Sequence, residues 1–350
     1  MWVSGYSPLA GYGFMLKGSL SLDRLPETLL VTTPLIFTGL AMVFAFRGSM
    51  FNVGGEGQFV AGAFAAAWAG ITFTGLPAYI HLPLALLTGA LVGALVGFIP
   101  GILKARLGAH EVISTIMLNY VIANLTDYLV LYPFAEGGSM PETKLVAETA
   151  RLGHLFPNSQ LSSAFFLALL TAIVIHFLLW KTVIGFEVRG VGLNPVASLR
   201  KGIKVKNIMT LAMVISGAIA GLGGAGETLG TYGRFMMGFS PGYGFDGIAV
   251  ALVAGLNPLG VIPAAFMFGV LRVGGTYMQQ FANIPSALVT IIQGLMILFI
   301  IAPRLTTLVM SIFRHKPKII GRRDDYATHP LGSVGLDAAD GQSSEGYRVE

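Results

Sequence analysis

Residues 181–206, KTVIGFEVRGVGLNPVASLRKGIKVK, form a basic interruption between two long apolar runs. This stretch contains six lysine and arginine residues but only one acid, Glu187. The apolar runs, residues 161–180 before it and 208–225 after it, are each long enough to cross a membrane. Loops rich in lysine and arginine stay on the cytoplasmic side of a membrane. We therefore predict that residues 181–206 are a cytoplasmic loop, and the orientation of the other spans can be counted from it.

A short helix is predicted inside this loop. Asn194 can accept hydrogen bonds from the free N–H groups of a first turn, and Pro195 suits the first helical position because it lacks an N–H. About two turns then cover residues 196–201, and Gly202 suits a left-handed end. Composition alone leaves two interpretations open, a solvated connector and a docking helix for a cytoplasmic partner.

The composition is that of a polytopic membrane protein. Of the 350 residues, 54% are hydrophobic and only 11% are charged, whereas soluble domains have about 25% charged residues. The net charge of +5 does not indicate a nucleic-acid partner, because the basic residues lie in short loops and next to apolar runs, where they orient a membrane protein. The absence of cysteine excludes disulfides and thiolate metal sites.

The first half of the chain predicts an all-α bundle with an interrupted helix. Residues 29–46 form a first span, and residues 51–58, FNVGGEGQ, form a glycine-rich hinge that leads into the small-residue run 59–73. Such a hinge indicates a broken or re-entrant helix, whose free backbone groups must be buried in protein or face water. The next span, residues 82–103, has glycines at positions 89, 93, 97 and 101, which would form a flat face for helix packing.

Polar residues are unusually frequent in the predicted span 111–132, and such groups should face the bundle interior or a pathway rather than lipid. Residues 134–160 and 230–246 are predicted to lie outside. The apolar run 247–274 is divided at Asn257-Pro258 into two shorter helices, because one span would leave the basic C-terminal tail outside.

A final span over residues 284–302 brings the expected total to about eight or nine crossings. In this division residues 1–28 are an N-terminal extracytoplasmic segment, residues 29–302 the transmembrane domain, and residues 303–350 a cytoplasmic and largely disordered tail.

Enzyme motifs are not supported. The run 221–226 matches a dinucleotide fingerprint but lies at the end of a membrane span rather than in a soluble βαβ unit, and the chain has no Gly-x-x-x-x-Gly-Lys-Ser/Thr phosphate loop. Uphill transport would therefore need a partner ATPase or an ion gradient. Gradient-driven transport usually requires membrane-buried acids, and the candidates lie near predicted span ends or hinges: Glu56, Glu111, Asp127, Glu227 and Asp246.

Five segments resemble, in order, a known family. They are FNVGGEGQ at 51–58, EVISTIMLNY at 111–120, GLNP at 192–195 with Gly202-Ile203, SGAIAG at 216–221 and GFDGIAVAL at 244–252. Together they resemble permease subunits of bacterial ABC importers of the branched-chain amino acid, ribose and nucleoside permease family, over about residues 10–310. The resemblance implies a type II ABC importer-like helical bundle, a multi-pass protein of the inner membrane. Family members commonly have a further N-terminal span before this match, so either the start is assigned too late or the first helix is absent.

The resemblance also implies the partners and the coupling site. Two permease subunits, the second expected to be a different but related chain, would surround one pathway, with cytoplasmic ABC ATPases and an extracytoplasmic substrate-binding protein or lipoprotein. ATP and magnesium would be used by the ATPase, and no cofactor would be bound by this chain. The loop helix occupies the place of the family's coupling helix, with these residues: Asn194, Pro195, Ala197, Ser198, Arg200, Lys201 and Gly202.

The expected function is import of a nucleoside, purine nucleosides first, or of a simple sugar, because the FNVGGEGQ segment resembles the nucleoside branch more than the ribose branch. The predicted pathway residues are polar side chains on broken or polar helices: Asn52, Glu56, Gln58, Asn119 and Asn124. Glu56 has an equally acceptable structural role, in which it satisfies free N–H groups of the hinge. The alternative function is an ion-gradient-driven secondary transporter that works without an ATPase.

Overall fold

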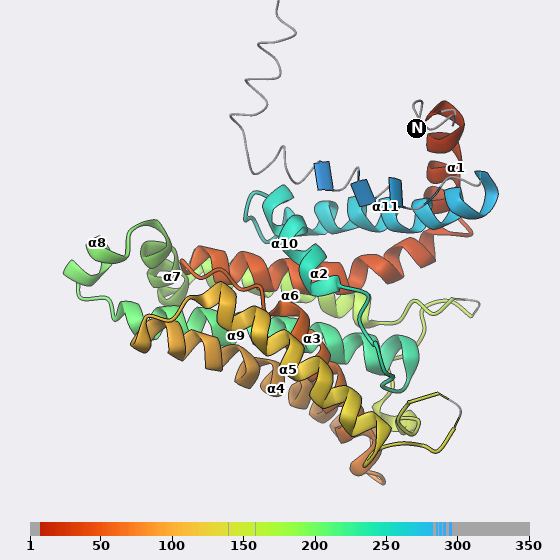
Figure 1. Cartoon of the computed structure of the whole chain (residues 1–350), viewed down its shortest axis with the longest axis horizontal. Helices are drawn as coiled ribbons and strands as arrows, with labels where there is room; N and C mark the ends of the chain where they lie inside the picture. The colour runs from red at the N-terminus through yellow and green to blue at the C-terminus, as the bar shows by residue number, and fades with distance from the viewer. Residues whose placement is uncertain are drawn as a thin grey trace, which may run out of the picture. The chain divides into compact units, whose positions relative to one another are not determined.

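The computed structural model describes residues 8–138, 140–157, 159–282 and single positions between 285 and 295, and the structural statements below concern these residues. They form helices and contain two isolated β-bridges, Glu142 with Met236 and His154 with Ser162 (Figure 1). The first half contains α1 (Pro8–Leu20), α2 (Leu25–Arg47), α3 (Gly55–Thr72), α4 (Ala78–Leu107), α5 (Glu111–Leu131) and the 3-10 turn η2 (Glu148–Ala150). The second half contains α6 (Ala164–Lys181), α7 (Val183–Leu193), α8 (Pro195–Arg200), α9 (Val205–Glu227), the π-helical turn η3 (Thr228–Tyr232), α10 (Tyr243–Val253) and α11 (Val261–Ala282).

The predicted all-α membrane bundle is confirmed. Six helices in the described part of the chain are long and apolar enough to cross a membrane: α2, α4, α5, α6, α9 with η3, and α11. The interrupted helix α3 and the short apolar helix α10 pack into the same bundle. The predicted final span, residues 284–302, and the tail, residues 303–350, lie outside the described residues apart from single positions.

Two helices form the centre of the bundle. Most of α2 is buried, with Phe37 and Phe44 fully enclosed, and α9 packs against α2, α3 and α4. In Figure 1 the ribbon of α4 runs alongside α5, and α11 lies on the opposite side of α2. The core is therefore built around α2 and α9, while α5 lies at its edge.

The predicted glycine face of α4 packs directly on a second glycine face. A Cβ added to Gly93 would lie 2.3 Å from the carbonyl oxygen of Gly217 in α9, and a Cβ added to Gly97 would lie 2.5 Å from the carbonyl oxygen of Met213. The two backbones approach so closely that only glycine fits. Helices in lipid associate through such close packing, since lipid provides no hydrophobic drive between them.

We expect Gly93→Ala to destabilise the protein by about 1–3 kcal/mol, because the added methyl group must displace the backbone of α9. Thermal unfolding in detergent, followed by size-exclusion chromatography, measures this. Gly13→Ala in α1 is the matched control, because a Cβ there meets nothing within 4 Å. Equal stability of the two variants would contradict the close packing of α4 on α9.

The predicted hinge is an interruption between two helices. α2 ends at Arg47, residues 48–54 are irregular, and α3 begins at Gly55. Most hinge residues are buried, with Phe51 as the exposed exception. This arrangement satisfies the requirement that irregular backbone at membrane depth be enclosed in protein.

Three details differ from the sequence-based expectations. Residues 183–193, predicted as part of a loop, form the helix α7, which packs closely on the end of α2: a Cβ at Gly192 would lie 2.0 Å from the carbonyl oxygen of Arg47. The division at Asn257-Pro258 is confirmed, but the second helix, α11, has 22 residues and is long enough to span. Finally, residues 243–246 are not part of an outer turn, because α10 begins at Tyr243 and Gly244 contacts the hinge.

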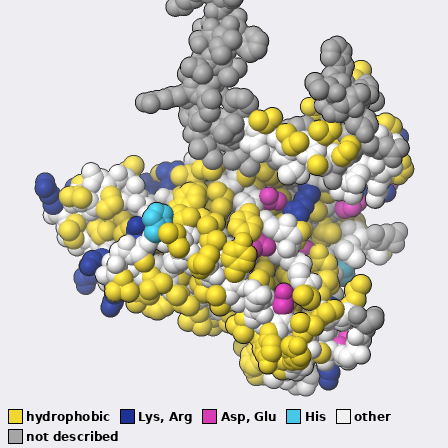
Figure 2. All heavy atoms as spheres, in the orientation of Figure 1, with side chains coloured by type: hydrophobic (Ala, Val, Ile, Leu, Met, Phe, Trp, Pro, Cys, Tyr) yellow, Lys and Arg dark blue, Asp and Glu magenta, His cyan; other side chains and the backbone are white. Residues whose placement is uncertain are grey.

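Lysine and arginine side chains gather at the end of the bundle formed by α7 and α8 (Figure 2). The ends of α4 and α9 at this side add Lys104, Arg106 and Lys206. By the positive-inside bias, we expect this end to be cytoplasmic and the end with η2 and η3, here called the outer end, to face the other side.

Candidate functional site

Two of the predicted pathway residues form a closed hydrogen-bond network inside the hinge. Asn52 is fully buried, and its Nδ2 donates to Gln58 Oε1 and to Ser216 Oγ, both at 2.8 Å. Its Oδ1 accepts from the Gly54 N–H at 2.9 Å and from Gln58 Nε2 at 3.2 Å. Gln58 is also fully buried. Every hydrogen-bonding position of the Asn52 amide is used inside the protein, so Asn52 and Gln58 fasten the hinge to α9 instead of facing a pathway.

Asn119 of α5 also binds the hinge backbone. Its Nδ2 donates to the Val53 carbonyl oxygen at 2.9 Å, and its Oδ1 accepts from the Gly57 N–H at 2.9 Å. The interrupted backbone would otherwise have a free donor and a free acceptor at membrane depth. Asn119 therefore has the structural role that the sequence analysis considered for Glu56.

Glu56 connects the hinge to α10. Its Oε2 accepts a hydrogen bond from the Gly244 N–H at 2.7 Å. A Cβ at position 244 would lie 2.2 Å from the Glu56 nitrogen, so the start of α10 and the start of α3 are in direct backbone contact. Glu56 thus satisfies a backbone donor and also borders an internal cavity.

The internal cavity has a volume of about 110 Å³ and lies between α3, α5 and the segment that leads into α10. Its walls contain both carboxyl and amide groups: Glu56, Asn119, Thr126, Asp127 and Ser240, with Phe235 and Phe239. The volume is well below the roughly 300 Å³ or more of typical small-molecule sites. The cavity is therefore too small to enclose a substrate by itself.

Asn124 lies on a separate, exposed face of α5. Its Nδ2 donates only to the Tyr120 carbonyl oxygen of its own helix, at 2.7 Å. Tyr120 and Tyr128, four residues before and after it, lie on the same face and are 64% and 56% exposed. Asp127, at the edge of this face, borders the cavity. Polar groups of a membrane-spanning helix avoid lipid, so this face must be covered by another protein surface or by water.

The structure thus separates the five predicted pathway residues into three groups. Glu56 and Asn119 border one cavity, Asn52 and Gln58 are packed behind it, and Asn124 lies on the exposed face of α5. This separation could not be predicted from the sequence, because it depends on which neighbouring helix each polar side chain faces.

Arg272 is a residue that the sequence analysis missed. It is the only charged residue of the 22-residue span α11, and its Nη1 donates to Asp246 Oδ2 at 3.0 Å. A charged side chain inside an apolar span is rare and usually functional. Arg272 could therefore have been found in the sequence as a charged residue within an apolar run. It was missed because only acidic residues were considered as charges inside the membrane.

The loop helix has the predicted geometry. Asn194 Oδ1 accepts a hydrogen bond from the Ala197 N–H at 3.0 Å, Pro195 is at the first position of α8, and Gly202 has φ +84°. Ser198 is buried against the protein, whereas Arg200 and Lys201 are exposed. The cap and the stop that the sequence predicts are thus confirmed.

Apolar side chains on α8 remain uncovered. Val196 and Leu199 are each 63% exposed, and together with residues 204–207 they line a groove of about 430 Å³. An exposed apolar groove with a basic rim is typical of a protein-binding surface.

Helix α7 attaches α8 to the bundle. The Arg189 guanidinium lies 4.4 Å from the centre of the Trp180 ring, and the Arg47 guanidinium lies 5.5 Å from the same ring. Arg47 Nε also donates to the Leu256 carbonyl oxygen at 3.0 Å. A displacement of α7 would therefore reach the end of α2, directly before the hinge.

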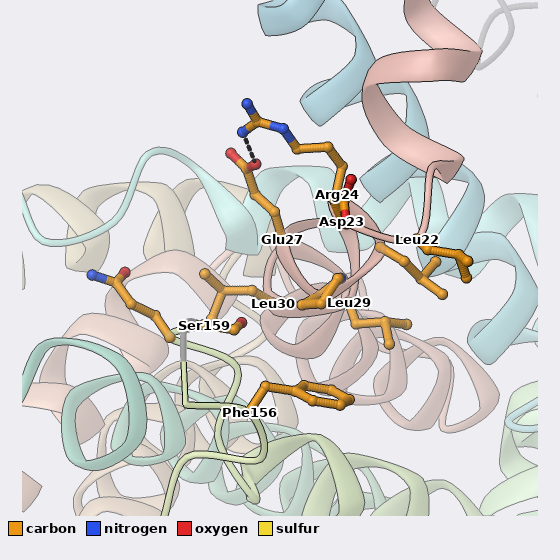
Figure 3. A pocket seen from close by; sticks show the side chains of 11 residues that line it. Leu22, Asp23, Arg24, Glu27, Leu29, Leu30, Phe156 and Ser159 are labelled. Atoms are coloured by element: carbon orange, nitrogen blue, oxygen red, sulfur yellow. Dashed lines mark hydrogen bonds and ion pairs between the residues drawn. The ribbon is translucent and has the colours of Figure 1, made fainter.

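A larger cavity, about 800 Å³, lies at the outer end and is separate from these groups (Figure 3). It lies between the start of α2 and the residues Phe156, Ser159 and Gln160, over an apolar floor that includes Leu29 and Leu30. Arg24 and Glu27 form an ion pair of 3.2 Å at its rim. It contains none of the predicted pathway residues.

Comparisons with known proteins agree with this architecture. The family model described as branched-chain amino acid transport system / permease component matches residues 25–301. The guanosine ABC transporter permease protein NupP of Bacillus subtilis is 44% identical over 90% of this chain and 92% of its own length. The nucleoside ABC transporter permease protein NupB of Lactococcus lactis is 36% identical over 86% of this chain and 85% of its own length. The glucose ABC transporter permease protein TsgB13 of Haloferax volcanii is 34% identical over 84% of this chain and 80% of its own length. The chain therefore belongs to the branched-chain amino acid transport system permease family, as its motifs predicted, and is a multi-pass permease subunit of an ABC importer in the bacterial inner membrane.

Proposed function

We propose that this chain imports nucleosides, purine nucleosides foremost, with a cytoplasmic ABC ATPase docked on α8. The observation that carries the proposal is the capped helix α8, which exposes Val196 and Leu199 at the basic end of the bundle. A helix with this exposure needs a partner, and the chain has no phosphate loop of its own. In this proposal ATP and magnesium are used by the partner, and this chain has no enzymatic activity and no cofactor.

The pathway runs along the exposed face of α5 and beside the 110 Å³ cavity. A second permease, a related chain, covers Tyr120, Asn124 and Tyr128 and supplies the other wall. This pairing accounts for polar side chains that would otherwise contact lipid. An extracytoplasmic binding protein or lipoprotein delivers the substrate to the outer end.

The substrate class is supported by chemistry and by the relatives. Carboxyl, amide and hydroxyl groups beside Phe235 and Phe239 suit a neutral substrate that combines an aromatic ring with hydroxyl groups. Two relatives at 44% and 36% identity are permeases for guanosine and for nucleosides. The 34% identical glucose permease keeps a simple sugar as the second candidate.

The test is uptake of radiolabelled guanosine into vesicles that contain the assembled transporter, with and without ATP on the ATPase side. We expect uptake only with ATP, competition by adenosine and inosine, and little competition by glucose. Competition by glucose alone would assign the substrate to the sugar branch.

The same assay distinguishes an ABC permease from the alternative function, an ion-gradient-driven secondary transporter. Glu56→Gln keeps an oxygen that can accept a hydrogen bond from the Gly244 N–H, but, unlike a carboxylate, the amide cannot take up and release a proton. We expect this variant to retain at least about half of the ATP-dependent uptake, because a neutral acceptor keeps the backbone hydrogen bond. Uptake by this chain alone that follows an ion gradient and is lost in Glu56→Gln would overturn the proposal.

A further inference from the structure

Residues 233–242, here named the strap, cover one side of the internal cavity. Four of them, Phe235, Gly238, Phe239 and Ser240, belong to the cavity wall. The rings of Phe235 and Phe239 are stacked with centres 4.9 Å apart, and both side chains are at most 5% exposed. The strap follows η3 at the outer end of α9 and precedes α10. It therefore lies between the cavity and the outer end of the bundle.

The backbone of the strap has points at which it can bend. Glycines with φ +66°, +68° and +96° stand at its start, its middle and its end, at positions 233, 238 and 242. Glycine adopts this left-handed region without steric cost, so rotations at these positions would move the segment between them. The strap contains no regular helix that would resist such a rotation.

The strap is bound on its outer side to the loop 136–152. The Val146 N–H donates to the Gly233 carbonyl oxygen and the Thr143 N–H to the Phe235 carbonyl oxygen, both at 2.9 Å. Arg234 also pairs with Glu136 at 3.1 Å and with Glu142. A movement of this outer loop would therefore be transmitted to the strap.

On the other side, Arg272 is the one charged side chain of α11 that meets the strap. Its Nη2 donates to the Pro241 carbonyl oxygen at 3.2 Å, its Nη1 pairs with Asp246 at 3.0 Å, and its guanidinium lies 4.9 Å from the Tyr243 ring centre. Arg272 lies about 16 Å along α11 from its first residue, at 1.5 Å per residue. An arginine at this depth requires a reason beyond packing.

We propose that the strap is the outer gate of the cavity and that Arg272 is the positioning residue that holds the gate closed. This inference rests on the proposed transport function. The Arg272 and Asp246 side chains are 30% and 39% exposed, so this chain encloses neither of them completely. Asp246 holds the Arg272 guanidinium in the position from which its Nη2 binds the Pro241 carbonyl oxygen of the strap. Breaking the ion pair therefore loosens the contact between Arg272 and the strap, and it leaves neither charge fully enclosed in the protein.

The test uses the absence of cysteine from the chain. Val60→Cys places a single thiol in the cavity wall, at a residue of α3 that is 9% exposed. The assembled transporter, nucleotide-free in right-side-out vesicles, is treated with membrane-impermeant thiosulfonate reagents, one cationic and one anionic. We expect slow modification with Arg272 present and modification at least about tenfold faster in Arg272→Gln, because one charged hydrogen bond already accounts for a change of that size.

Three controls distinguish a gate from a general loss of structure. Asp246→Asn should accelerate modification as Arg272→Gln does, whereas Arg24→Gln, which breaks an outer ion pair away from the strap, should not. A thiol introduced by Ala168→Cys, at a fully buried position of α6, should stay unreactive in all variants.

Two outcomes would overturn the gate. One is an equal rate of thiol modification in Val60→Cys with and without Arg272. The other is faster modification of the Ala168→Cys thiol in the Arg272→Gln background, which would show that Arg272 has only a structural role. Because labelling needs no transport, these outcomes are independent of the uptake assay. A transporter that labels as expected but carries no nucleoside would refute the substrate and leave the gate standing.

Discussion

Leu199→Asp is expected to abolish ATP-dependent uptake and to prevent co-purification of the ATPase with the permease. Leu199 is 63% exposed on α8 and lines the groove of about 430 Å³. In the complex it would be covered, and a buried carboxylate without a partner costs several kcal/mol. Docking sites usually depend on a few such residues, so a loss of at least about a hundredfold in affinity is expected.

The folded permease should not change, because the Leu199 side chain is mostly exposed. Amounts in the membrane and thermal stability in detergent are the controls. Leu22→Asp, at a position 87% exposed on the outer side, is the matched variant and should leave ATPase binding intact. If Leu199→Asp binds the ATPase normally, α8 is only a solvated connector, the other interpretation that composition left open.

Asn52→Ala is expected to prevent stable folding. The substitution leaves the Gly54 N–H and both ends of the Gln58 amide without their partner in a fully buried position, while Ser216 keeps only its hydrogen bond to the Ala41 carbonyl oxygen. Each buried group without a hydrogen bond costs about 1–3 kcal/mol, so the summed loss approaches the whole stability of a typical domain, about 5–15 kcal/mol. The protein should accumulate poorly and lose its size-exclusion peak on mild heating.

Asn124→Ala is the matched comparison, since Asn124 donates only to the backbone of its own helix. This variant should fold normally, with a change in the free energy of unfolding below about 1 kcal/mol, and should instead reduce the rate of uptake. If instead Asn52→Ala folds normally and only raises the substrate KM, Asn52 lines the pathway as the sequence first predicted, and the hydrogen-bonded hinge does not exist in the working transporter.

Much of the fold could be predicted because the bilayer imposes simple rules. The span lengths, the basic end of the bundle around residues 181–206 and the interruption at residues 51–58 follow from hydrophobic length, the distribution of lysine and arginine, and glycine content. The cap at Asn194 was also predictable, because its hydrogen bond closes within three residues of the same chain. The glycine face of α4 was also predictable, because its glycines recur every four residues along the sequence.

The sequence by itself therefore determined most of the apolar spans of the described residues, which end of the bundle is basic, and where the loop helix begins and stops. Only the tertiary structure decided the roles of the polar residues. Asn52 meets Ser216 from 164 positions away, Asn119 meets Val53 from 66, and Arg272 meets Asp246 from 26. The helical period places a side chain on one face of its own helix, but the neighbour of that face depends on how all the helices pack, and that packing is set by contacts between segments distant in the chain.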